Sequence, residues 1–297
     1  MPQALAALAL VLNALIWGLS WWPFREMQLL GLHPLWATGV LYAIALAVLL
    51  LCRPQALLAC RHHPELLWLA LAAGLTNVCF NWAVTLGDVV RVVLLFYLMP
   101  AWVVVLAWPL LGERPTPGAL ARLVLALAGV VVVLKTPEVP WPWPQLGTDW
   151  LALAGGMCFA LTNILLRRFQ RAPESTRMVA MLMGGSGMAF MAALLLGFVA
   201  AGLTDVGMTV SVQPPQDWAW LPWAVGTGLA FLLANLGLQY GAARLRANVT
   251  SLIMLTEVVF ATTSSVLQGA SSLELRTLLG GALILTAALW AALEGSS

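Results

Sequence analysis

The sequence predicts an all-α membrane protein of ten transmembrane helices, arranged as two inverted five-helix repeats with the N- and C-termini in the cytoplasm. Three observations predict this fold. Of the 297 residues, 62% are apolar and only 9% are charged, whereas a soluble domain carries about 25% charged residues. Apolar stretches long enough to cross a bilayer recur along the whole chain. Polar residues of the first half reappear in the second half at a nearly constant spacing.

Each predicted helix is an apolar stretch bounded by charges or by Pro and Gly. A bilayer core about 30 Å thick needs about 20 such residues per helix. In order, the predicted spans are 4–23, 34–52, 66–86, 89–111, 118–135, 149–167, 178–201, 221–243, 248–268 and 273–293. The first stretch has no basic residues before it and nine similar stretches follow, so we interpret it as a span rather than a signal peptide.

The basic residues predict the orientation. With the N-terminus in the cytoplasm, ten of them fall on or near the cytoplasmic side: Arg53, Arg61, Arg114, Arg122, Arg167, Arg168, Arg171, Arg177, Arg244 and Arg246. Four fall on the other side: Arg25, Arg91, Lys135 and Arg276. Short cytoplasmic loops are enriched in Lys and Arg, so this division favours cytoplasmic termini and a multi-pass protein of the cell inner membrane.

The internal repeat divides the chain into 1–140 and 141–297. A shift of 158 positions, from 77 to 235, aligns Asn77 with Asn235. A shift of 142 positions, from 25 to 167, aligns Arg25 with Arg167 near the start of each half. Since five spans is an odd number, the second half enters the membrane from the opposite side. Inverted repeats are typical of secondary transporters, although apolar helices can also align by chance.

Several functional classes find no support in the sequence. Net charge is +2, so there is no electrostatic signature of nucleic-acid binding. The four cysteines form no CxxC pair, and we expect no metal or other cofactor. The single lysine does not belong to a phosphate-binding loop, and the three histidines lie in loops or at span ends without an HExxH motif, which argues against an enzyme.

Five motifs carry a family resemblance. They are IWG at 16–18, LMP at 98–100, LLGERPT at 110–116, TEVVFA at 256–261 and LGGALI at 279–284. With these motifs the chain resembles the EamA-like branch of the drug/metabolite transporter superfamily, whose members have ten helices in two five-helix repeats. The resemblance implies export or exchange of small metabolites, often amino acids or their derivatives. The chain departs from the family where Glu257 is followed by Val258 instead of proline, which predicts that any proline kink at this position is lost.

Glu257 is the ionisable residue closest to the centre of a predicted span. Charged groups within a bilayer are costly, by about 2.5–3.5 kcal/mol on insertion scales, and they mark functional sites by default. Glu257 is therefore a candidate for proton coupling or for binding a cationic group of the substrate. The alternative is a scaffold or gating role, in which it forms a hydrogen bond to a neighbouring helix.

Amide side chains form a stripe on two spans. Asn77 and Asn81 lie one turn apart on the third span, and Asn235 and Gln239 repeat them on the eighth. Positions i and i+4 project from the same side of a helix, so these residues predict one polar face that lines a cavity. Hydrogen bonding between helices is the alternative.

Aromatic residues extend the candidate cavity. Trp17 and Trp21 form a stripe with Asn13 on the first span, and Asn163 is the repeat partner of Trp21. Trp82 and Tyr97 are further candidates; packing or lipid-facing roles remain the alternative for the tryptophans.

Three residues of the third and fourth spans are candidates for coupling or gating. Pro100 lies within the fourth span and predicts a kink that frees backbone carbonyls. Asp88 and Arg91 flank the turn between the two spans, and their spacing predicts an i, i+3 ion pair at the outer mouth.

Taken together, these residues predict a secondary transporter, acting as an exporter of an amino acid or a related amphipathic compound by alternating access. Efflux of organic cations is the main alternative and a lipid flippase is another. The expected partners are a small-molecule substrate and membrane lipid. A proton and a second copy of the chain remain candidates, and nucleic acid is not expected.

Overall fold

The computed structural model describes residues 2–112, 114, 116–135, 143–202, 217–242, 244–245, 250, 253–272 and 274–294. The secondary structure in these residues is helical, without strands. The helices are α1 (Pro2–Leu19), α2 (Trp21–Leu29), α3 (Pro34–Cys52), α4 (Gln55–Cys60), α5 (Leu66–Leu86), α6 (Val89–Phe96), α7 (Met99–Leu111), α8 (Pro117–Leu134), α9 (Gly147–Arg168), α10 (Glu174–Gly202), α11 (Leu221–Ala242), α13 (Thr256–Leu267) and α14 (Leu275–Glu294).

Eight segments of the described chain are long and apolar enough to cross a membrane, and they match the first eight predicted spans. The predicted tenth span corresponds to α14, in which the apolar stretch Leu275–Trp290 is shorter. The predicted ninth span begins in residues outside the described part, and α13 covers its second half. An all-helical, multi-pass membrane protein is therefore confirmed, whereas the total of ten spans stays a prediction.

The first span bends where α1 gives way to α2. The amide and the hydroxyl of Ser20 both donate to the carbonyl of Trp17, at 3.1 and 2.7 Å. Pro23 has no N–H, so the carbonyl of Leu19 receives no helical hydrogen bond from it. As a result the i, i+4 register of α1 does not continue into α2.

The fourth span is interrupted in the way that Pro100 predicts. The helix α6 ends at Phe96, and α7 begins at Met99 with Pro100 in its first turn. The ninth span is also interrupted, because a turn at Leu255 precedes α13. This interruption does not depend on a proline, since Val258 follows Glu257 and α13 continues through it, and the loss of a proline kink stays a prediction.

Helices cross closely where both contribute glycine. A Cβ at Gly129 of α8 would lie 2.7 Å from the carbonyl oxygen of Gly280 of α14, and a Cβ at Gly280 would lie 2.6 Å from that of Gly129. A Cβ at Gly74 of α5 would similarly overlap the backbone of Gly184 in α10. Small residues at helix crossings are typical of membrane bundles, since close backbone packing replaces the hydrophobic effect there.

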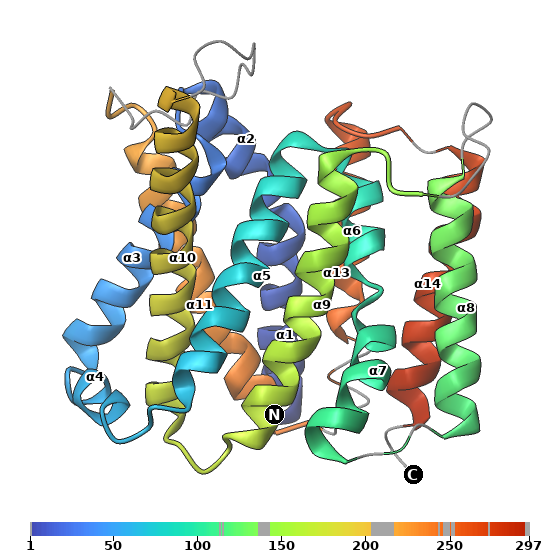
Figure 1. Cartoon of the computed structure of the whole chain (residues 1–297), viewed down its shortest axis with the longest axis horizontal. Coiled ribbons are helices and arrows are strands. Elements are labelled where there is room, and N and C mark those ends of the chain that lie inside the picture. The colour runs from blue at the N-terminus through green and yellow to red at the C-terminus, as the bar shows by residue number, and fades with distance from the viewer. Residues whose placement is uncertain are drawn as a thin grey trace.

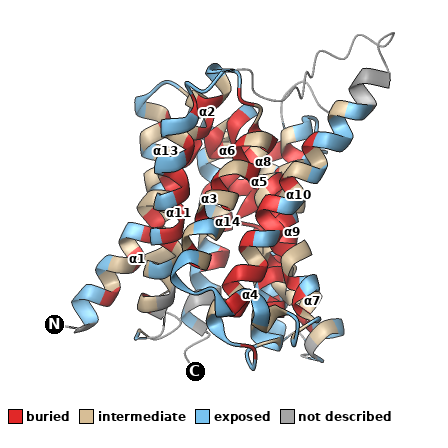
Figure 2. Ribbon diagram, turned by 90° about the vertical axis from the view of Figure 1, so that its left-hand side faces the viewer, coloured by how far each residue is buried: buried red, intermediate tan, exposed pale blue. Residues whose placement is uncertain are grey.

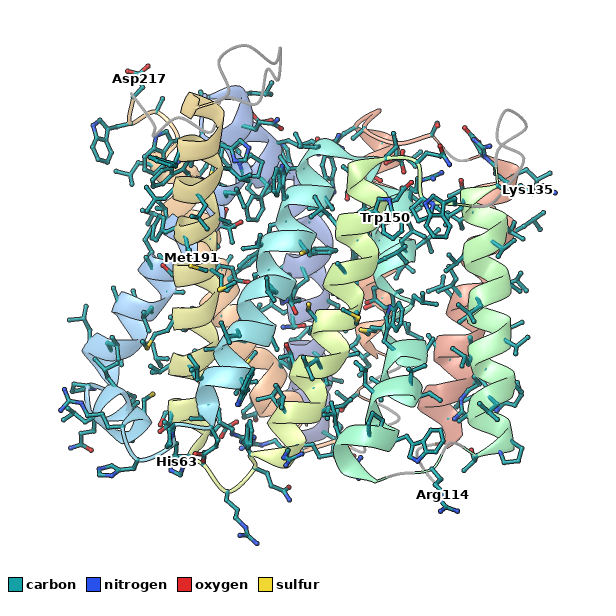
Figure 3. All side chains as sticks on the ribbon, in the orientation of Figure 1. His63, Arg114, Lys135, Trp150, Met191 and Asp217 are labelled. Atoms are coloured by element: carbon teal, nitrogen blue, oxygen red, sulfur yellow. The ribbon has the colours of Figure 1, made fainter. Side chains whose placement is uncertain are left out.

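The bundle has two different ends. In Figure 1, α1 begins and α14 ends at the lower end, whereas α2 lies at the upper end. His63 and Arg114 lie at the lower end, and Lys135 and Asp217 at the upper end (Figure 3). We name the lower end the basic end and the upper end the far end. Figure 2 shows that buried residues gather in the middle of the bundle.

Candidate functional site

A cavity of about 740 Å³ occupies the centre of the bundle. Its lining begins midway along the helices, with Asn13 and Trp17 of α1, and continues to Arg122, Glu174 and Arg177 near the basic end. Among the described residues, its lining includes none from the turn between α5 and α6 at the far end. The cavity therefore extends from the middle of the bundle towards the basic end.

Six of the residues that the sequence predicts as site candidates contribute to the lining of this cavity. They are Trp17, Asn77, Tyr97, Asn163, Asn235 and Glu257. They come from six helical segments that are far apart in the sequence, and the fold brings them to one space. The side chains of Pro100 and Gln239 lie outside the described part of the structure.

Tyr97 and Glu257 meet where the two interrupted spans face each other. The hydroxyl of Tyr97 donates towards Oε2 of Glu257 at 3.1 Å and towards the carbonyl of Met254 at 3.3 Å. Tyr97 follows the last residue of α6, and Glu257 lies in the first turn of α13. A carboxylate is favourable at a helix N-terminus because unpaired N–H groups point towards it. The pair therefore joins the two interruptions directly.

Aromatic side chains surround the middle of the cavity. The ring of Trp17 stacks on Phe231, with 4.3 Å between the ring centroids and 25° between the planes. Phe96 contacts both Phe80 and Phe159, at centroid distances of 4.6 and 5.5 Å. The rings of Trp17, Phe80, Phe96 and Phe159 line the cavity and give it a mainly apolar wall with a few polar positions, which is typical of sites for small molecules.

The amides on this wall are held by specific bonds. Asn163 and Asn235 donate to the carbonyls of Phe159 and Phe231 in the preceding turn, at 2.9 and 2.8 Å. Asn77 differs, because its Oδ1 accepts a hydrogen bond of 2.7 Å from the hydroxyl of Tyr42. The amides therefore present different atoms to the cavity.

The mouth near the basic end carries charge of both signs. Arg122 lies with its guanidinium 5.8 Å from the ring of Trp290. Arg177 donates to the carbonyl of Leu166 at 3.2 Å, and Glu174, three positions earlier in the chain, begins α10. The sequence interpretation assigned both arginines only to the membrane boundary, because a position at a span end does not reveal whether a side chain turns inwards.

Three other candidates lie in helix contacts away from the cavity lining. The indole N–H of Trp21 donates to the hydroxyl of Ser264 at 3.0 Å. The bend at Ser20 changes the helical register, so the buried Trp21 no longer lies on the same helix face as Trp17. Asn81 is fully buried and donates to Thr38 of α3 at 3.3 Å. Trp82 lies edge-on to His33, 5.5 Å between centroids. For Asn81 the structure therefore shows the alternative, a hydrogen bond between helices. Of the two amides of the predicted stripe on α5, Asn77 lines the cavity and Asn81 does not.

Asp88 and Arg91 lie at the far end, where their arrangement corrects the predicted ion pair. Asp88 caps α6 by accepting a 2.8 Å hydrogen bond from the backbone N–H of Arg91. The guanidinium of Arg91 instead makes a bidentate pair with Asp149 of α9, at 2.7 and 2.9 Å, and also donates to Val133 at 3.2 Å. Asp149 is fully buried. No pattern in the sequence indicates this partner, which lies 58 positions away.

Comparison with known proteins relates this architecture to a family. Residues 4–135 match the EamA-like transporter family. A solved structure titled "Crystal structure of protein" has 21% sequence identity and a TM-score of 0.56, covering 98% of this chain and 99% of that chain. At this identity the likeness is one of fold alone. No curated protein matches the sequence.

Proposed function

We propose that the protein is a membrane transporter of the drug/metabolite transporter superfamily and that it exports a small metabolite from the cytoplasm. The match of residues 4–135 to the EamA-like transporter family supports this proposal. The proposed substrate is an amino acid or a related amphipathic compound. The observation that carries this proposal is the central cavity of about 740 Å³, which lies within the range of about 300–1,000 Å³ for small-molecule sites.

The distribution of charge supports a cytoplasmic position for the basic end. Arg53 and Arg61 flank α4 at this end, and Arg168 ends α9 there. Positively charged short loops favour the cytoplasm, so the cavity faces the cytoplasm in this conformation and the protein belongs in the inner membrane. A cavity that is open to the cytoplasm and closed at the far end suits the loading step of an exporter.

The pattern of helix contacts supports transport by two inverted repeats, 1–140 and 141–297. The first span, α1, packs on α11 and α13; its repeat partner, α9, packs on α5 and on the α6–α7 pair. Likewise, α3 packs on α11 as α10 packs on α5, and α8 packs on its own partner, α14. A bundle with this internal symmetry can open alternately at its two ends by rocking one half against the other.

Organic cations are the second candidate substrate class. The carboxyl group of Glu257 lies on a wall rich in aromatic rings, and such walls attract cations through their π-faces as well as through charge. A broad cation exporter would accept chemically unrelated cations, whereas a metabolite exporter would prefer one class.

Counterflow in proteoliposomes tests the proposal. Vesicles preloaded with an unlabelled amino acid mixture should accumulate radiolabelled amino acids above equilibrium, and Trp17→Ala should reduce this accumulation at least tenfold by removing the stacked wall. Leu51→Ala, on the exposed surface, is the matched control and should keep normal accumulation. Accumulation of tetraphenylphosphonium without amino acids would favour cation efflux, and no accumulation of either would reject both functions.

A further inference from the structure

The hydrogen bonds within the cavity wall constrain which ligands this wall fits. A backbone carbonyl can only accept, so the side chains that bond to Phe159 and Phe231 must point their amide nitrogens at these carbonyls. The nitrogens of Asn163 and Asn235 lie 2.9 and 2.8 Å from the two oxygens. These bonds do not engage the Oδ1 atoms, and both residues line the cavity, so we expect the Oδ1 atoms to be available to a ligand.

Hydroxyl groups on the same wall are oriented in the same way. Thr76 and Thr162 each donate to the carbonyl four residues earlier, at 2.8 and 2.9 Å. A hydroxyl has one hydrogen and two lone pairs, so a donating threonine retains only acceptor capacity. Glu257 adds a carboxyl group, of which only Oε2 receives the bond from Tyr97.

We propose that this acceptor-rich wall, formed by the side-chain oxygens of Asn163, Asn235, Thr162 and Glu257, is a binding subsite for the ammonium group of the substrate. An ammonium group has three donors and no acceptor, which complements free oxygens beside one carboxylate. The phenyl rings of Phe96 and Phe159 also line the cavity, and the face of an aromatic ring attracts a cation.

Two features of the cavity indicate that the ligand also carries acceptors. The Oδ1 of Asn77 accepts a hydrogen bond from Tyr42, which leaves the amide nitrogen of Asn77 as a donor for a ligand. Arg177 lines the mouth of the cavity and is a second donor. The inference rests on the proposed transport function and narrows its substrate to compounds with a free amine. The ammonium subsite can be tested with a zwitterion and with an organic amine, because both carry the ammonium group.

Ligand pairs that differ in the amine alone test this inference. The probes are L-leucine against 4-methylpentanoate and phenethylamine against 2-phenylethanol, measured by thermal shift of the purified full-length protein, because a ligand that binds only the native state raises its Tm. In each pair that binds, the amine should bind at least tenfold more tightly. Equal or tighter binding of the amine-free members would overturn the ammonium subsite and leave transport intact, whereas no shift and no counterflow with any probe would reject the proposed function as well.

Two variants test whether the preference for the amine depends on the proposed wall. Glu257→Gln should reduce the preference for the amine to less than threefold, and the nearly isosteric Asn163→Asp should increase it by adding a negative charge to the wall. Glu65→Gln, the same change in a loop at the basic end, is the matched control and should keep the tenfold preference. An unchanged preference in both Glu257→Gln and Asn163→Asp would place the amine elsewhere, and Asn163→Asp still decides the matter if Glu257→Gln does not fold.

Discussion

The far end and the basic end of the bundle are held together by different kinds of bonds. At the far end, the first and second halves of the chain are joined by the buried pair Arg91–Asp149, at 2.7 Å, and by Ser271, which accepts from the backbone of α6 at 3.1 Å. Among the described residues at the basic end, Arg168 donates to the carbonyl of Leu110 at 2.9 Å in an exposed hydrogen bond, and the thiol of Cys60 donates weakly to the carbonyl of Thr176 at 3.8 Å.

From this difference we expect the basic end to open more readily than the far end. Breaking a buried ion pair leaves a charge without compensation, whereas water replaces an exposed bond at little cost. The two halves also differ in sequence here: the repeat register of 158 aligns Arg91 with Val249, since 91 plus 158 is 249, and the register of 142 aligns Asp149 with Ala7, since 149 minus 142 is 7. In the predicted repeat register the ion pair therefore has no counterpart among the aligned residues, and we expect it to hold the far end in the arrangement that the structure describes.

The largest effect is expected from Asp149→Ala. Removing the carboxylate leaves the mostly buried guanidinium of Arg91 unpaired, and loss of one partner of a buried pair costs about 3–5 kcal/mol. The Tm of the detergent-solubilised variant should fall accordingly. Opening of the far end can be measured in vesicles with the variant Ala152→Cys, whose cysteine would be buried on the same helix. An impermeant maleimide added at the far end should label this cysteine at least ten times faster in the double variant with Asp149→Ala than in Ala152→Cys alone.

The matched control is Glu274→Gln, which removes another ion pair at the far end. Its partner is Arg276, and the two side chains are 49% and 30% exposed. Exposed pairs contribute about 0–1 kcal/mol, so labelling of Ala152→Cys should change less than twofold. Equal effects of the Asp149 and Glu274 variants would mean that burial does not distinguish these pairs and that the comparison of the two ends is wrong.

A smaller effect is expected from Arg25→Ala, within the first half. Arg25 donates to the carbonyls of Thr85 and Gly87 at 3.2 and 2.6 Å and thereby fastens α2 to the end of α5. Hydrogen bonds to charged groups contribute about 1.5–3 kcal/mol. The Tm should fall by less than in Asp149→Ala, and Arg25→Lys should lie between wild type and Arg25→Ala because an ammonium reaches one carbonyl. A Tm unchanged in Arg25→Ala would show that these carbonyls are equally well satisfied by water.

The sequence predicted the features that depend on composition along a single helix. Eight spans could be located because each needs a continuous apolar stretch, and Glu257 was found because charge is rare within such stretches. The partner of Arg91 could not be predicted, since the i, i+3 spacing to Asp88 is visible in the sequence whereas the approach of Asp149 depends on packing between helices.

The candidate cavity residues also differ in whether packing between helices leaves them open to the cavity. Trp17 and Asn235 line the cavity, but Trp21 does not, because the bend at Ser20 breaks the helical register on which its prediction relied. Asn81 shares a helix face with Asn77, yet α3 covers it and Thr38 receives its hydrogen bond. A stripe identifies the face of a helix, but the neighbouring helices decide which turns of that face remain open.

The smallest effect concerns pH and again separates the two ends. His33 begins α3 at the far end, where its Nδ1 accepts a 3.2 Å hydrogen bond from the N–H of Leu35, and partial burial lowers the pKa of His33 to about 4. At the basic end, the hydrogen bond from His63 lowers the pKa of the exposed Glu65 carboxyl. The contribution of Glu65 to stability is thus present above its ordinary pKa of 4.5 and is lost only as the pH falls through the lowered value.

The contribution of His33 changes at higher pH. Its unfolded pKa is about 6.5, so the unfolded chain binds a proton between pH 6.5 and 4 that the folded chain does not, and stability should fall as the pH is lowered through this window. After allowance for partial exposure of the ring, the loss between pH 7 and pH 5 should be about 1 kcal/mol. His33→Ser keeps a side-chain cap for α3 but cannot titrate, so its Tm should lose most of this pH dependence, whereas Glu65→Gln should keep it. If His33→Ser retains the full decrease in Tm, the far end is not the part of the bundle that responds to protons in this range.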